Sequence, residues 1–172
     1  MFAVLSAFAE ALYLKVSAVM VLGLQETYRG IGDWPLFLRD YQVFESIAEG
    51  GRARGLPGGR MGQNGLALVV HRSLVAHEIG DPSPYLVGVR LMIGTAEWVV
   101  INTYLPPRGY PGRVAALQDL RNAVRAVYAR DLGARLLVLG DWNVDEDRLQ
   151  QLLQRWRQPL TRVPCVGNPA SF

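Results

Sequence analysis

Hydrophobic positions near the N-terminus follow a helical period and then become continuous. Leu5, Phe8, Leu12 and Val16 recur every three or four residues, which predicts an amphipathic helix. The run that follows, residues 18–25, is short, apolar and rich in branched side chains. Such a run is typical of a strand buried on both faces, so we expect a helix followed by a central strand.

The middle of the chain has the pattern of further strands separated by turns. Residues 41–46 predict a short strand, whereas residues 50–65 contain seven glycines and three arginines and predict a loop. The apolar stretches 66–71 and 85–93 predict two more strands, with a turn at the sequence GDPSP between them. We therefore expect these two strands to be neighbours in a meander.

The next stretch, TAEWVVINTYLPP, predicts a strand that ends at Pro106. Side chains alternate between the two faces of a strand. The prediction therefore places Trp98, Val100, Asn102 and Tyr104 on one face and Val99, Ile101, Thr103 and Leu105 on the other.

Two helical stripes follow this strand. The first consists of Leu117, Leu120, Val124, Val127 and Tyr128, with Arg121, Arg125 and Arg130 off the stripe. We expect Gly133 to cap this helix and residues 134–140 to form another buried strand. The sequence DEDRLQQLLQRW predicts a last helix with an apolar side made of Leu149, Leu152, Leu153 and Trp156.

Strands in the middle with helices nearer both ends predict an α/β (α+β) fold. We expect a two-layered sandwich in which mixed β-sheets are covered by helices. The length of 172 residues favours one domain, residues 1–172. Half of the residues are hydrophobic and 19% are charged, which argues against a disordered chain.

Charge and cysteine content add little about partners. The net charge is +3, and Lys15 is the only lysine among 18 basic residues. Arginine suits phosphate, but such a preference also fits the coding bias of a genome, which we favour. The single cysteine, Cys165, excludes an intrachain disulfide and favours a reducing compartment. We expect an intracellular protein, with the nucleus as a candidate location, and the sequence leaves its oligomeric state open.

The apolar N-terminal residues raise the question of a membrane segment. Glu10 and Lys15 interrupt them, and no basic residue precedes them. We therefore expect neither a targeting signal nor a membrane partner.

Two apolar runs end at a carboxylate, and this is the main hint of chemistry. Glu26 follows VLGLQ, and Asp141 follows LLVLG. Ligands of open α/β sheets sit at the carboxyl ends of strands, and two carboxylates with few other ligands suit Mg²⁺. In extended chain Asn143 would project to the same side as Asp141, and Tyr104 could reach the same crevice.

Each of these residues also has a plain structural explanation. An Asp-x-Asn sequence after a strand is a common turn, and a Tyr at a strand end is often half-buried packing. Taken singly, Asp141, Asn143 and Tyr104 leave both readings open.

Four sequences in order, LGLQET, GLALVVHR, VVINTYLPP and LVLGDWNV, resemble the endonuclease/exonuclease/phosphatase superfamily. INTYLPP is most similar to the apurinic-endonuclease branch and to endonuclease domains of non-LTR (LINE-type) retrotransposons. The resemblance covers about residues 18–144. It implies a DNA endonuclease that hydrolyses phosphodiesters with a divalent metal, Mg²⁺, or Mn²⁺ in its place.

The resemblance also assigns roles to matching residues. Glu26 matches the metal-binding Glu and Tyr104 the active-site Tyr. Asp141 matches the Asp that orients or activates the attacking water. Asn143 matches the Asn that contacts the phosphate or positions that Asp.

Two motifs of the family are not found in these 172 residues: an Asn in the first strand and a terminal Ser-Asp-His. His71 and His77 are expected to be surface histidines rather than substitutes. The comparison implies a partial domain that lacks the first and last strands and has a greatly reduced rate.

The loop with Arg52, Arg54 and Arg60 is the candidate nucleic-acid contact, although a plain surface loop is the alternative. Three functions remain open: a DNA endonuclease, an inactive remnant or nucleic-acid-binding module, and a phosphatase acting on a phospholipid or small phosphoester.

Overall fold

The computed structural model describes residues 20–25, 27, 39–46 and 65–156, which form two sheets and two helices. The first sheet has three antiparallel strands in the order β1-β3-β2: β1 (Val21–Leu24), β2 (Tyr41–Ser46) and β3 (Leu66–His71). The second sheet has four strands in the order β4-β5-β6-β7: β4 (Ala76–Ser83), β5 (Leu86–Ile93), β6 (Ala96–Tyr104) and β7 (Arg135–Asp141). Its pairings are antiparallel except for β6 and β7, which are parallel and connected by helix α2 (Arg113–Arg130). Helix α3 (Glu146–Trp156) follows β7.

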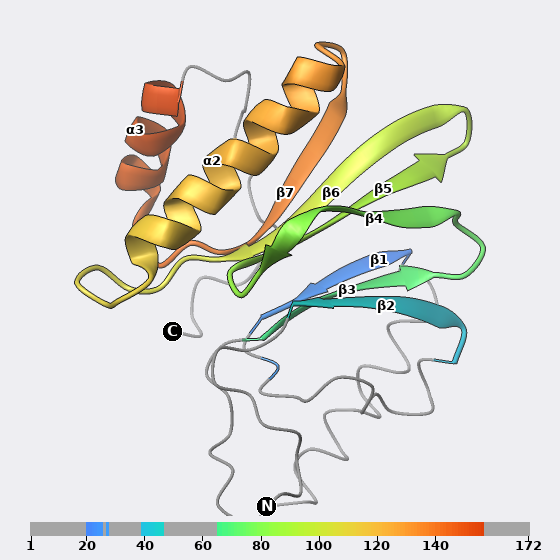
Figure 1. Cartoon of the computed structure of the whole chain (residues 1–172), viewed down its shortest axis with the longest axis horizontal. Helices are drawn as coiled ribbons and strands as arrows, with labels where there is room; N and C mark the ends of the chain where they lie inside the picture. Colours follow the sequence, from blue (N-terminus) through green and yellow to red (C-terminus); the bar gives the residue numbers. More distant parts are fainter. Residues whose placement is uncertain (1–19, 26, 28–38, 47–64, 157–172) are drawn as a thin grey trace, which may run out of the picture.

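The two sheets face each other, and both helices cover the outer face of the four-stranded sheet (Figure 1). One apolar cluster, which includes Leu68, Val89 and Val100, fills the space between the sheets. A second cluster lies between the four-stranded sheet and the helices and includes Ile101 and Leu120. The predicted two-layered sandwich with mixed sheets and covering helices is confirmed.

Strand β6 contributes to both clusters, as the alternation of its side chains requires. Val100 and Tyr104 face the three-stranded sheet, whereas Val99 and Ile101 face the helices. The faces predicted from the sequence of this strand are therefore correct.

The predicted meander of residues 66–71 and 85–93 is wrong. These residues form β3 and β5, which belong to different sheets, and β4 lies between them in the chain. The sequence of β4 includes Gly80, Asp81 and Pro82, whose residue types predict a turn. Among the described strands β4 lies at the edge of its sheet, and its pairing with β5 is irregular between Ile79 and Ser83, where such residues are tolerated.

Strands β1 and β7 are less buried than predicted. Each is an edge strand of its sheet within the described residues, and all four residues of β1 are only half-buried. In β7 the side chain of Leu137 is 36% exposed. An apolar run fits a strand with both faces covered, but it does not show whether a neighbouring strand covers the edge.

The two helices pack as predicted. Leu120, Val124 and Val127 of α2 are buried against the sheet, together with Leu153 and Trp156 of α3. Gly133 is not the cap of α2. Asp131 takes that position in extended conformation, with its N–H bonded to Val127 O at 3.1 Å, and its Oδ1 accepts the N–H of Gly133.

Other predictions concern the surface. His77 is exposed, on β4 rather than in a turn, and His71 is half-buried at the end of β3 with its ring edge-on to Tyr41. No described helix is long and apolar enough to cross a membrane. The predicted first helix lies outside the described residues.

Candidate active site

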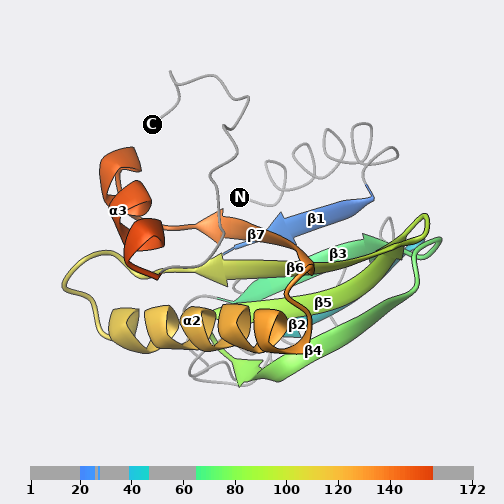
Figure 2. The same ribbon diagram turned by 90° about the horizontal axis from the view of Figure 1, so that it is seen from above.

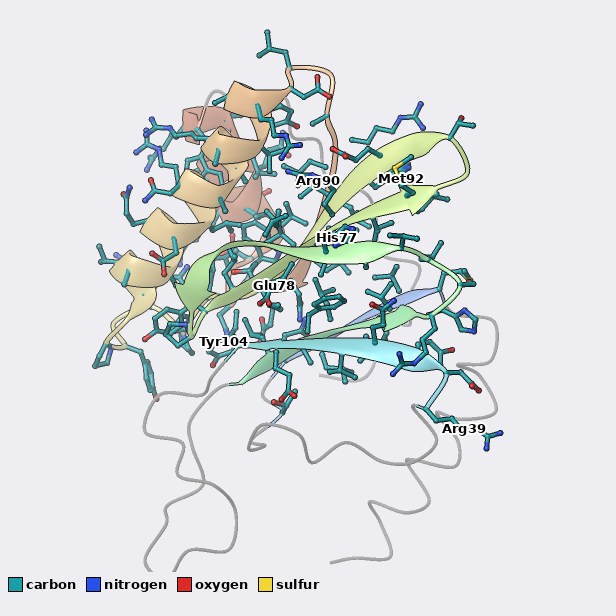
Figure 3. The ribbon with its side chains drawn as sticks, turned by 45° about the vertical axis from the view of Figure 1, so that its right-hand side comes forward. Arg39, His77, Glu78, Arg90, Met92 and Tyr104 are labelled. Atoms are coloured by element: carbon teal, nitrogen blue, oxygen red, sulfur yellow. The ribbon has the colours of Figure 1, made fainter. Side chains whose placement is uncertain are left out.

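The carboxyl ends of β1, β6 and β7 point to the same end of the sandwich (Figure 2). The parallel register pairs Tyr104 with Asp141, so the last residues of β6 and β7 are neighbours. Because residues paired in this way share a face of the sheet, both side chains emerge on the side of β1. Tyr104 is buried there, and Figure 3 shows it at the opposite end of the molecule from Arg39 and Met92. The sequence prediction that Tyr104 and Asp141 meet at one edge agrees with this register.

Gly140 allows β7 to approach β6 closely just before Asp141. Its φ is 146°, and a Cβ at this position would lie 2.0 Å from the backbone O of Thr103. Any side chain would therefore push the two strands apart. The pairing continues past the strand end, where Leu105 N donates to Asp141 O at 2.9 Å.

Asp141 and Asn143 form a closed turn rather than an extended segment. Asn143 has a φ of 44°, in the left-handed region that Asn tolerates better than most residues. Its backbone N–H donates to Asp141 Oδ1 at 2.9 Å, and its Nδ2 donates to Asp141 Oδ2 at 3.2 Å and to Leu105 O at 3.0 Å. The two side chains meet as predicted, but through this turn and not through strand periodicity.

The turn leaves the Asp141 carboxylate exposed at the surface and fixed in orientation. The hydrogen bonds from Asn143 hold the Asp141 carboxylate in place, and the roles that the resemblance gives these two residues stay predictions. The plain turn and the candidate site predicted from the sequence thus involve the same two residues. Hydrogen bonds from N–H groups to both oxygens fix the direction in which this carboxylate can accept a proton or bind a cation.

Asn102 lies on β6, two residues before Tyr104, and its hydrogen bonds join the two sheets. Its side chain is fully buried, and its Nδ2 donates to Leu24 O at 2.8 Å and to Ala67 O at 3.0 Å. Its Oδ1 accepts a hydrogen bond from Gln25 Nε2 at 2.5 Å. The sequence placed Asn102 on the face of Tyr104 but did not show these partners. A lone amide on the inner face of an apolar strand is the signal that could have indicated them.

Four predicted site residues lie outside the described residues: Glu26, Arg52, Arg54 and Arg60. Glu26 lies in the sequence between Gln25, which binds Asn102, and Thr27, whose N–H donates to Gly65 O at 3.0 Å. Within the described residues no group of three or more His, Cys, Asp or Glu side chains is arranged to hold a metal. Of the predicted site residues with a carboxylate, Asp141 is the one that lies within the described residues, and its part in a Mg²⁺ site stays a prediction.

The loop after β6 carries an exposed aromatic and an exposed basic side chain. Tyr110 N donates to Pro107 O at 3.1 Å, and the guanidinium of Arg113 binds Pro106 O. Tyr110 is 65% exposed, and Arg108, two residues earlier in the sequence, is also exposed. The sequence of this segment predicts only a turn.

The sandwich with a carboxylate at the ends of its strands defines a known class of protein. Residues 7–162 match the Endonuclease/Exonuclease/phosphatase family. The chain therefore belongs to this family, and the resemblance inferred from the four sequences is confirmed.

Solved structures agree with this assignment at the level of the fold. The catalytic domain of human Nocturnin, with a bound sulfate anion, is 21% identical with a TM-score of 0.57, covering 79% of this chain and 56% of that domain. The endonuclease domain of TRAS1, a telomere-specific non-LTR retrotransposon, is 19% identical with a TM-score of 0.56, covering 85% and 62%. D. rerio TDP2 with a single-strand DNA product is 14% identical with a TM-score of 0.52, covering 85% and 56%.

The chain spans less than two thirds of each of these three structures. Identities this low show a shared fold and not a shared substrate. No curated protein matches the sequence.

Proposed function

We propose that this chain is the catalytic part of a DNA endonuclease of the retrotransposon type, which hydrolyses phosphodiesters with Mg²⁺. The observation that carries the proposal is the Asp141 carboxylate, which is exposed, held by two hydrogen bonds from Asn143 and paired in register with Tyr104. An exposed carboxylate held in one orientation is suited to act on a water molecule at the surface of the site.

In the proposed reaction, a water molecule attacks the phosphorus atom, the bond between phosphorus and the leaving sugar oxygen breaks, and that oxygen takes up a proton from solvent. Asp141 orients this water and accepts its proton. Asn143 keeps the carboxylate in place through its Nδ2. The Tyr104 phenol lines the site at the end of β6, and Glu26 supplies a metal-binding carboxylate. A cation held by these residues would neutralise the charge that develops on the phosphate.

DNA as the substrate is supported by basic and aromatic residues of the chain. Arg52, Arg54 and Arg60 are the phosphate contacts expected from the sequence, and Arg108 and Tyr110 add a second basic and aromatic element. Arginine contacts with phosphate position a protein on DNA without reading its sequence, and an exposed Tyr offers a surface on which a base can stack. Among the similar structures, TRAS1 is an endonuclease domain and one TDP2 structure contains a DNA product.

Nicking of supercoiled plasmid in the presence of Mg²⁺ tests this function. We expect slow nicking by the chain, loss of nicking in Asp141→Ala, and unchanged nicking in Asp147→Ala. Asp147 is the matched control because it is also exposed, but it lies on α3 and outside the turn that holds Asp141. Equal background in all three proteins would contradict the proposal.

Two other outcomes would replace the proposal with one of the alternatives. Binding of labelled duplex DNA without any nicking would identify a nucleic-acid-binding module. Hydrolysis of a phosphoinositide or another small phosphoester in preference to DNA would identify a phosphatase. Location in the cell is separate from these tests, and the nucleus remains our prediction.

A further inference from the structure

Asn102 is a fully buried polar side chain that the proposed reaction does not use. It lies on the inner face of β6, two residues before Tyr104, in the apolar layer between the sheets. A buried amide is costly unless its polar atoms are all bonded. Here they are bonded, and every partner belongs to the other sheet or to the residue that follows its first strand.

The chemistry of these partners fixes which way the amide points. Leu24 O and Ala67 O are both acceptors, so the atom that faces them must be the donor, Nδ2. Oδ1 is then turned to the donor Nε2 of Gln25. The Asn102 side chain on β6 thus bonds to Ala67 of β3, to Leu24 at the end of β1 and to Gln25, the next residue.

Gly23 lets β1 come near enough for this contact. A Cβ at Gly23 would lie 3.0 Å from Asn102 Oδ1 and 3.3 Å from Leu139 Cδ1. Both distances are tighter than most Cβ contacts. The contact between β1 and Asn102 therefore depends on the absence of a side chain at residue 23. Strand β1 is otherwise paired only with β3 within the described residues.

We propose that Asn102 and Gln25 are positioning residues that set the carboxyl end of β1 against the carboxyl ends of β6 and β7. Tyr104 and Asp141 lie on one side of this contact, and Glu26 is the next residue in the sequence after Gln25. The inference rests on the proposed function. It explains how the end of β1, which precedes Glu26 in the sequence, keeps its distance from the ends of β6 and β7, which carry Tyr104 and Asp141.

Substitution of Gln25 tests the proposal with less risk to folding than substitution of Asn102. Gln25 is half-buried, and Gln25→Met keeps the length of the side chain while removing the donor to Asn102. The matched control is Gln42→Met. Gln42 is also half-buried and belongs to the same sheet, and its Nε2 donates to Leu74 O at 3.1 Å.

We expect Gln25→Met to raise the Mg²⁺ concentration for half-maximal nicking about fivefold, with the rate at saturating Mg²⁺ nearly unchanged. That factor is the population change that one neutral hydrogen bond supports. Gln42→Met should leave the Mg²⁺ dependence unchanged, although both variants lose one hydrogen bond. An equal Mg²⁺ dependence in the two variants would overturn the proposal.

A second measurement does not depend on activity. In the amide NMR spectrum without metal, Gln25→Met should shift the signals of Tyr104 and Asp141, whereas Gln42→Met should not. If the wild type nicks no DNA but these shifts occur, the positioning contact stands and the proposed function fails. If neither signal moves in Gln25→Met, the positioning role is wrong, whatever the activity.

Discussion

Replacement of Gly140 by Ala gives the most direct test of the packing that presents Asp141. The new Cβ would lie 2.0 Å from Thr103 O, whereas real Cβ atoms essentially never come closer than 3.0 Å to another heavy atom. The two strands would have to separate by about 1 Å at this point, which is the difference between these values. Thr103 O is a backbone atom in a paired strand, so it cannot move aside as the end of a side chain could.

The cost of this separation can be estimated from its parts. A non-glycine residue at positive φ costs about 1–2 kcal/mol. Weakening of two neighbouring ladder hydrogen bonds adds about 1 kcal/mol each. We therefore expect Gly140→Ala to lower the free energy of unfolding by about 3–4 kcal/mol.

Gly94→Ala is the matched control, because Gly94 also has a positive φ of 61° but has no atom within 4 Å of the new Cβ. Gly94→Ala should lower the free energy of unfolding only by the cost of the positive φ, about 1–2 kcal/mol. Urea unfolding followed by tryptophan fluorescence measures both. If the two variants differ by less than about 0.5 kcal/mol, the close approach of β6 and β7 is not as described.

Three further predictions concern stability away from the site. Leu120→Ala should cost about 2–5 kcal/mol in urea unfolding because Leu120 is 0% exposed, whereas Leu132→Ala, at 88% exposed, should stay within about 0.5 kcal/mol. Asp145→Ala should cost about 1 kcal/mol and reduce the helical circular dichroism signal, because Asp145 Oδ1 caps α3 by accepting Arg148 N at 2.9 Å; an equal loss in Asp147→Ala would contradict this. Burial raises the pKa of Tyr128 above 10.0, so its contribution to stability is intact below that pH and is lost as the pH rises through the folded pKa. Tyr128→Phe should therefore lose less stability than wild type between about pH 9 and about pH 11, and equal losses would contradict this assignment.

Much of the fold could be predicted from periodicity. The helical stripe of α2 and the two faces of β6 depend on local spacing, which the sequence displays directly. β4 was missed because its Gly80, Asp81 and Pro82 have turn chemistry, and only an irregular edge strand accommodates them. The exposure of β1 and β7 depends on which strands lie beside them, and an apolar run carries no information about its neighbours.

The candidate site could also be predicted only in part from the sequence. The carboxylate Asp141 was found because it ends an apolar run, and its register with Tyr104 follows from the parallel pairing of β6 and β7. The turn that binds Asn143 to Asp141 needs a left-handed residue, which strand periodicity does not predict. The partners of Asn102 are 35 to 78 residues away in the sequence, so only the folded chain brings them together.

The central claim is that a divalent cation binds where the carboxyl ends of β1, β6 and β7 meet. Replacement of Mg²⁺ by paramagnetic Mn²⁺, followed by amide NMR, locates such a cation directly. The account predicts that the signals of Gln25, Asp141 and Asn143 broaden first, while those of Gly94 and Gly133, next to the amino ends of β6 and β7, remain sharp. Broadening that starts at Gly94 or Gly133, or equal broadening throughout, would contradict it.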